Sequence, residues 1–190
     1  MADGTLKVGT ITTSSGSGTI TIGQSGETIS IPSGATFNTT GATVSGAGAN
    51  TPSFLVSNTG NNTGKTDNAY SKMTYNVETY DTDSAFDLSN NKFTVPTGKA
   101  GKYFFSVTEF LVGDSAACVD WYVALYKNGS SQVATGGNDI DFGNTSPTFS
   151  AVLDLAVSDY IEVYCKVNTS SGTWGQYAGG IWQGFKLIGV

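Results

Sequence analysis

The residues that could carry out chemistry are few, because the chain contains no histidine and only two cysteines. Without histidine, the commonest general base, the usual partner of a nucleophile and the commonest metal ligand are all missing. Cys118 and Cys165 lie far apart in the sequence and do not have metal-site spacing, so we expect neither a metal pair nor a disulfide scaffold. Serine-nucleophile, cysteine–histidine and zinc mechanisms are therefore excluded.

Two pairs of carboxylates are the remaining catalytic candidates. Asp81 with Asp83, and Asp139 with Asp141, are close enough in sequence to act together in glycoside cleavage. Each pair also fits a solvated acidic turn, and this is the interpretation we favour. We therefore expect the protein not to be an enzyme.

Aromatic residues in a glycine-rich stretch are candidates for ligand binding. Residues 168–183 hold Trp174, Tyr177 and Trp182 among glycines. Exposed rings on such loops can stack on sugar rings, so Trp174 and Tyr177 are our ligand-binding candidates. Packing between subunits is an equally good interpretation of these two residues.

The composition favours a β-rich extracellular or virion protein. Charged residues make up only 13% of the 190 residues, aromatic residues make up 12%, and there are 25 glycines. The formal net charge is −6 and no basic run is present, which argues against nucleic acid and anionic membrane surfaces as partners. The first residues lack a positive segment followed by an apolar run, so we expect no signal peptide. These features together are typical of a virion component.

Residues 1–52 differ in composition from the rest of the chain. Their only charged residues are Asp3, Lys7 and Glu27, and the pairs Ile20/Ile22 and Ile29/Ile31 recur nine residues apart among Gly, Ser and Thr. Two apolar positions in a very short strand cannot form a core of their own. The pattern therefore predicts a β-structured stalk or docking segment wound with other copies of the chain. A disordered linker is the alternative.

Residues 53–190 have the pattern of one all-β domain. Short apolar runs alternate with turns rich in Gly, Asn, Ser and Asp, and no segment has a sustained helical period. This pattern predicts a sandwich or jelly roll. We expect strands at residues 54–57, 72–77, 92–95, 102–111, 119–126, 132–135, 148–155, 160–167 and 184–188.

The strand expected at 102–111 carries aromatic residues on both of its faces. Tyr103 and Phe105 alternate with Phe104, and Phe110 lies on the same side as Phe104. A strand that covers a core on one side only should not show this. It fits a strand packed on its own core and also on a neighbouring subunit.

Several short motifs follow one another in a fixed order. A proline-terminated strand at 91–96 leads through a turn to the aromatic run 101–105; Lys-Asn-Gly at 127–129, Asp159 and Gln-Gly-Phe-Lys-Leu at 183–187 follow. This series resembles the globular head of complement component one, subcomponent q, and its tumour-necrosis-factor relatives. The resemblance covers about residues 70–190.

The resemblance implies a ten-stranded-type jelly roll that forms a homotrimer, with inner sheets packed around a threefold axis, and the last strand central in its sheet. It also allows calcium at the apex, where Asp139 and Asp141 are candidate ligands. The chain has no collagen repeat, and Tyr-Asp-Thr-Asp at 80–83 together with residues 1–52 looks more like phage and bacterial versions of the head. Our candidates for the trimer interface are Tyr103, Phe104, Phe105, Phe110 and Phe185.

We therefore expect a non-enzymatic homotrimeric bacteriophage structural protein: a head fibre, a capsid decoration protein or a tail fibre. Residues 1–52 would dock on other virion proteins, and the jelly-roll head of residues 53–190 would face outward. The expected location is the virion, which is extracellular after host lysis. The alternative is an adhesin that binds a host-surface glycan or receptor through the apex loops of the head.

Overall fold

The computed structural model describes residues 9–11, 18–40, 50–114, 117–142 and 144–188, with only the backbone described for 139–142. The chain divides into two units, residues 1–45, here called the leader, and residues 46–190, here called the head. All the strands that the structure describes lie in the head, and the described residues contain no helix. Accordingly, no helix among them has the length and apolar character needed to span a membrane.

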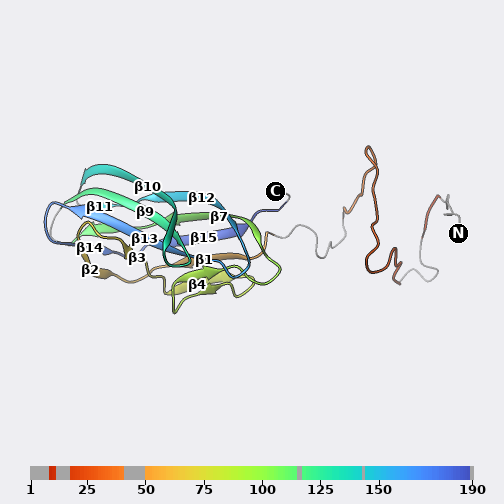
Figure 1. The fold of residues 1–190 in the computed structure, drawn as a ribbon, viewed down its shortest axis with the longest axis horizontal. Helices are drawn as coiled ribbons and strands as arrows, with labels where there is room; N and C mark the ends of the chain where they lie inside the picture. The colour runs from red at the N-terminus through yellow and green to blue at the C-terminus, as the bar shows by residue number, and fades with distance from the viewer. Residues whose placement is uncertain (1–8, 12–17, 41–49, 115–116, 143, 189–190) are drawn as a thin grey trace. The chain divides into compact units, whose positions relative to one another are not determined.

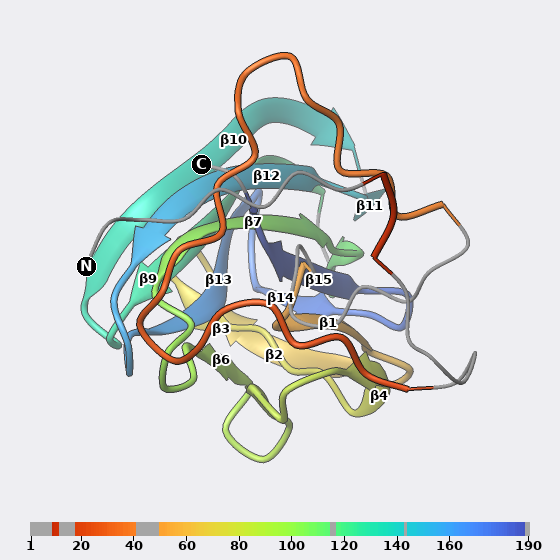
Figure 2. The ribbon, with the colours of Figure 1, turned by 90° about the vertical axis from the view of Figure 1, so that its right-hand side faces the viewer.

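The head is built on two large antiparallel sheets (Figures 1 and 2). The five-stranded sheet has β15 at its centre, between β7 and β1, as the sequence predicted for the last strand. In spatial order it consists of β12 (Thr148–Leu155), β7 (Gly101–Thr108), β15 (Ile181–Lys186), β1 (Ser53–Ser57) and β4 (Val77–Asp81).

The six-stranded sheet forms the second layer of the sandwich. Its long strands β9 and β13 pair along most of their length. Its path runs β10 (Ser131–Phe142), β9 (Cys118–Lys127), β13 (Tyr160–Thr169), β6 (Lys92–Thr94) and β5 (Phe86–Asp87), and β3 (Ser71–Lys72) also pairs with β13. The all-β sandwich predicted from the sequence is therefore confirmed.

A small four-stranded sheet caps one end of the head (Figure 1). The chain enters and leaves the head at the other end, where the Lys186 amide donates to the Pro52 carbonyl at 3.0 Å. We call the capped end the apex. The small sheet has the order β11 (Asn144–Thr145), β8 (Leu111–Gly113), β14 (Thr173–Gln176) and β2 (Asn62–Thr66).

Aromatic packing joins the two large sheets. Phe54 of β1 stacks on Phe86 and on Phe93, each with ring centroids 5.1 Å apart, and meets Trp182 edge-on at 5.2 Å. All four rings are buried. Because β1 and β15 belong to one sheet and β5 and β6 to the other, this cluster fixes the sheets against each other. Such ring pairs each contribute about 0.5–1.5 kcal/mol beyond their buried area.

Turn residues occupy the conformations that their types predict. Asn128 and Gly129 both have positive φ, 54° and 75°, between β9 and β10. Asp159 accepts the Ala156 amide at 2.8 Å, as expected for an aspartate in a turn before a strand. Both cysteines are buried and neither forms a disulfide.

The described residues of the leader hold two turns and no strand. The first turn is closed by the Glu27 amide donating to the Gln24 carbonyl at 3.1 Å, and the second by the Ala35 amide donating to the Pro32 carbonyl at 3.0 Å. A single copy therefore shows no β structure at residues 9–11 and 18–40. The β-stalk expected from several copies stays a prediction.

Gly184 in the central strand should not tolerate a side chain. A Cβ there would lie 2.6 Å from Phe105, 2.9 Å from Phe54 and 3.0 Å from the Phe104 carbonyl oxygen. We predict that Gly184→Ala lowers the free energy of unfolding by about 1–3 kcal/mol, because the core is already filled. Urea denaturation measures this change.

The matched control is Gly60→Ala, since a Cβ at Gly60 meets only Asn58 Oδ1, at 3.9 Å. The control should change the free energy of unfolding by less than about 0.5 kcal/mol. Equal effects of the two substitutions would contradict the packing described for β15.

Candidate functional site

The outward face of the five-stranded sheet is the first candidate site. Cross-strand pairing places its residues in three adjacent rows, since residues that face each other across a strand pair lie on the same side of the sheet. We call these rows the uncharged face, because none of their side chains carries a charge. The rows are Val152, Phe104, Phe185 and Ser53; then Ser150, Ser106, Gln183, Leu55 and Tyr80; then Thr148, Thr108, Ile181, Ser57 and Val77.

Large apolar side chains are spread over the uncharged face. The Phe104 and Phe185 rings lie 5.3 Å apart on neighbouring strands, and both are partly exposed. Val152 beside them is 54% exposed, and Tyr80 and Ile181 are about 40% exposed. Scattered apolar residues are ordinary on a surface, but a continuous apolar patch indicates an interaction site.

The outward side of the six-stranded sheet has a different character. It carries an ion pair between Lys72 and Glu162. Lys166 lies over the Tyr122 ring, with the ammonium 4.4 Å from the ring centroid. Charges therefore solvate this side of the sandwich, and the contrast singles out the uncharged face.

Only part of the interface predicted from the sequence lies on the uncharged face. Phe104 and Phe185 do, but Tyr103 and Phe105 must be corrected. Both side chains are completely buried inside their own chain. They point into the sandwich, where Phe105 packs against Phe93 with ring centroids 5.5 Å apart. No surface of these two residues is available to a partner.

Phe110 and Tyr177 lie at the apex, outside the three rows of the uncharged face. The Tyr177 amide donates to the Phe110 carbonyl at 2.8 Å, and their rings meet edge-on at 6.3 Å. Both side chains are partly exposed. Tyr177 therefore remains an accessible aromatic residue, although one ring edge is already in contact with Phe110.

Trp174 must be corrected as a ligand-binding candidate. Its side chain is completely buried in β14, and the indole Nε1 donates to the Thr66 carbonyl at 2.9 Å. The Lys65 ammonium lies 5.7 Å from the ring centroid. A sugar ring cannot stack on an indole that the chain has already enclosed.

The carboxylate pairs give no catalytic site in the described residues. Asp81 accepts the Phe86 amide at 2.7 Å and thereby closes the turn after β4, while Asp83 forms an ion pair with Lys99 at 3.2 Å. The side chains of Asp139 and Asp141, the calcium candidates, lie outside the described residues. Among the side chains that are described, no group of three or more metal-ligating residues is placed to hold a metal ion.

A buried polar cluster lies just beneath the apex. Glu109 is completely buried; its Oε1 accepts the Tyr75 hydroxyl, and its Oε2 accepts Gln176 Nε2 at 2.8 Å. Gln176 also accepts a hydrogen bond from the Thr74 amide through Oε1 and donates one to the Thr74 carbonyl through Nε2. Gly180 lies so close that a Cβ there would be 2.5 Å from Glu109 Oε2. The cluster ties the end of β7 to β14 and to the segment between β3 and β4.

Burial dominates the electrostatics of this cluster and raises the pKa of Glu109 to about 7, although Tyr75, Gln176 and the charge of Lys65 act in the opposite direction. Burial is also the main cause of the pKa shifts of the other titratable groups in and around the cluster. Burial raises the pKa of Tyr75 and of the Cys165 thiol and lowers the pKa of Lys65. Glu109 is therefore the group of this cluster that changes its charge near neutral pH.

Sequence reasoning missed Glu109 and half of the uncharged face. Glu109 continues the inward row of Tyr103 and Phe105, and a carboxylate in an apolar row is a signal that could have been used. Val152 carried a similar signal, because it interrupts the inward alternation of Ala151 and Leu153 with a large apolar residue on the outer side.

Comparison with known proteins supports the fold alone. No family model matches the chain, and no curated protein matches it. The globular domain of the zebrafish complement 1qA protein superposes with a TM-score of 0.50 at 16% identity, over 72% of this chain and 98% of that one. Murine APRIL superposes with a TM-score of 0.53 at 10% identity, over 71% and 98%. The head thus has the jelly-roll fold shared by the complement and tumour-necrosis-factor domains.

Glu109 makes the stability of the head depend on pH. Its pKa in the folded state, about 7, lies above that of an exposed glutamate, so the folded state binds the proton more tightly. The contribution of Glu109 to the free energy of unfolding should therefore be fully present below about pH 4 and fall by about 2–4 kcal/mol as the pH rises through 7. Urea denaturation between pH 5 and pH 8 measures this fall.

Glu109→Gln is the matched variant, because a glutamine can still accept from Gln176 and can donate to the Tyr75 oxygen. The fall in unfolding free energy between pH 5 and pH 8 should be much smaller in this variant than in the wild type. If both proteins lose the same amount, Glu109 is not the group responsible.

Proposed function

We propose that the head forms a homotrimer by burying the uncharged face, and that the protein is a non-enzymatic structural component of a bacteriophage particle. The observation that carries the proposal is the contrast between the two outer sides of the sandwich. One side carries the Lys72–Glu162 ion pair and the Lys166 ammonium, and the other exposes Phe104, Phe185 and Val152, with no charged residue in the three rows of the uncharged face.

Self-association explains why this face lacks charges. At an interface, an unpaired buried charge costs free energy, whereas apolar side chains and small hydroxyls can be covered at no such cost. The short side chains of Ser106, Ser150 and Thr108 would allow another copy of the chain to approach closely beside the two phenylalanine rings. The number of copies, three, comes from the resemblance of the ordered sequence motifs to a trimeric family.

The layout of the chain supports the role in a particle. The chain enters the head beside the place where it leaves, because Pro52 pairs with Lys186. The leader therefore joins the end of the head opposite the apex. A leader docked on other virion proteins would direct the apex outward. A head fibre, a capsid decoration protein and a tail fibre all share this arrangement, and labelling intact particles with an antibody against the head distinguishes them.

The adhesin alternative has lost its strongest support. It placed ligand contacts in the apex loops, including Trp174 and Tyr177, and Trp174 is enclosed. Tyr177 alone, in contact with Phe110, does not favour glycan binding over ordinary packing. We therefore do not propose it as a second function.

The interface is tested by placing charges on the uncharged face. We predict that the double variant Phe104→Glu, Phe185→Glu elutes as a folded monomer, whereas the wild type elutes as a trimer, because desolvating the new carboxylates opposes association. Size-exclusion chromatography with light scattering measures the mass, and circular dichroism confirms the fold.

The control is Val133→Glu, which places a charge on β10 of the other large sheet at a residue that is 37% exposed. This variant should remain a trimer. A wild-type protein that is monomeric at all concentrations tested would refute the proposed assembly.

A further inference from the structure

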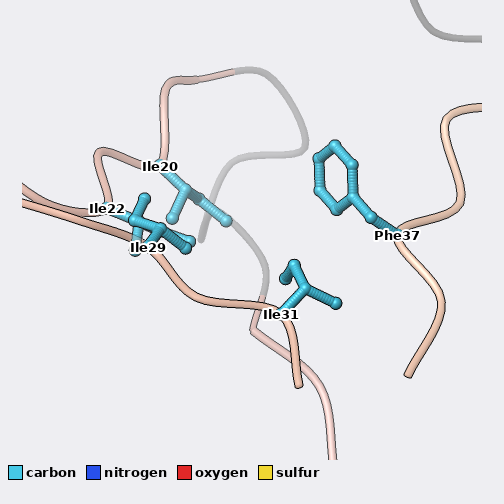
Figure 3. A pocket seen from close by; sticks show the side chains of 5 residues that line it. All are labelled: Ile20, Ile22, Ile29, Ile31 and Phe37. Atoms are coloured by element: carbon cyan, nitrogen blue, oxygen red, sulfur yellow. The ribbon is translucent and has the colours of Figure 1, made fainter. Parts of the chain in front are cut away.

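The leader exposes a second apolar surface. Five large side chains surround a hollow of about 480 Å³ that has no polar residue in its lining (Figure 3). Each of these side chains is between 43% and 73% exposed. The lining residues are Ile20, Ile22, Ile29, Ile31 and Phe37.

These residues come from units that repeat along the chain. Ser25-Gly26 and Ser33-Gly34 occupy the centres of two hydrogen-bonded turns, and both glycines have positive φ, 89° and 84°. Ile29 and Phe37 each follow the glycine of their turn at the same distance in sequence. Ile29 and Phe37 thus occupy equivalent positions after successive turns, and the Ile20/Ile22 pair recurs as Ile29/Ile31; apolar residues that recur in this way can build a shared core.

The backbone between the turns is also unpaired. In the described part of the leader, the two turn bonds are the only backbone–backbone hydrogen bonds. The amides and carbonyls around Ile20–Ile22 and Ile29–Ile31 therefore have no backbone partner within these residues. A segment that offers both apolar side chains and unpaired backbone groups is suited to strand addition.

We propose that the hollow is filled by the same residues of two further copies of this chain, so that three leaders share one apolar core. This inference rests on the proposed trimer of the head. The trimer would hold the three leaders together at a high effective concentration, so that weak contacts between them become sufficient.

Charge distribution favours copies of this chain over a foreign partner. Glu27 is the only charged residue between Lys7 and Lys65. Its carboxylate accepts the Gln24 amide of its own turn at 2.7 Å. The leader therefore has no exposed pattern of charge that would select a partner of opposite sign, and little that would repel a second copy. A repeated apolar unit is complementary first of all to itself.

Variants of the whole chain that each carry one added cysteine test the inference. Ile29→Cys and Ser30→Cys differ by one position, and Ile22→Cys with Thr21→Cys forms a second such pair. The native Cys118 and Cys165 are completely buried, so the wild type serves as the blank. In the purified trimer, cysteines at 22 and 29 should react with a maleimide at least about tenfold more slowly than those at 21 and 30.

The same labelling in the Phe104→Glu, Phe185→Glu background separates contacts between copies from contacts within one chain. We expect the protection at 22 and 29 to disappear in this monomer; protection that persists would show a leader folded on itself and overturn the inference. Equal labelling at all four positions in a protein with the mass of a trimer would overturn it and leave the head trimer standing. Protection that arises only when phage particles are added would assign the hollow to another virion protein. A monomeric wild type would refute the proposed function and this inference together.

Discussion

A sheet in a two-layer sandwich has two faces, and its own chain covers only one of them. In this head the covered face of the five-stranded sheet is filled by Phe54, Phe105 and Trp182, all of them completely buried. On the other face, three adjacent rows carry no charged side chain, and the first charges are Asp154 and Lys102, which face each other in the row beyond Val152 and Phe104. The absence of charge from these three rows is the constraint on which our account depends, and we propose that further copies of the chain cover them.

The same constraint orders the rest of the molecule. The aromatic cluster fixes the two large sheets against each other, and thereby fixes which side of β7 and β15 faces outward. The small sheet and the Glu109 cluster close the apex, at the far end from the Pro52–Lys186 pair. The leader also exposes apolar side chains, its isoleucines, in a segment with almost no charge. We therefore interpret the head and the leader as two parts of one proposed assembly.

Much of the fold could be predicted from alternation and turn chemistry. Ile161, Val163 and Cys165 face the core as their spacing predicts, and β15 lies at the centre of its sheet. The alternation of side chains along a strand does not tell which of two apolar rows faces the core. For this reason the sequence wrongly suggested that Tyr103 and Phe105 lie at an interface. The strands of the small sheet were missed because β2, Asn-Thr-Gly-Lys-Thr, has no apolar residue. Trp174 was taken for a loop residue because the partners that enclose it, Thr66 and Lys65, lie more than a hundred residues earlier.

The most direct measurement is hydroxyl-radical footprinting of the wild-type protein in solution, with the denatured chain as the reference for intrinsic reactivity. Phe104 and Phe185 on one side of the sandwich, and Tyr122 and Tyr164 on the other, are all partly exposed in a single copy. Our account predicts that the two phenylalanines are protected while the two tyrosines are oxidised. Phenylalanines that are oxidised as readily as the tyrosines would show that the uncharged face remains open to water, and would contradict the account.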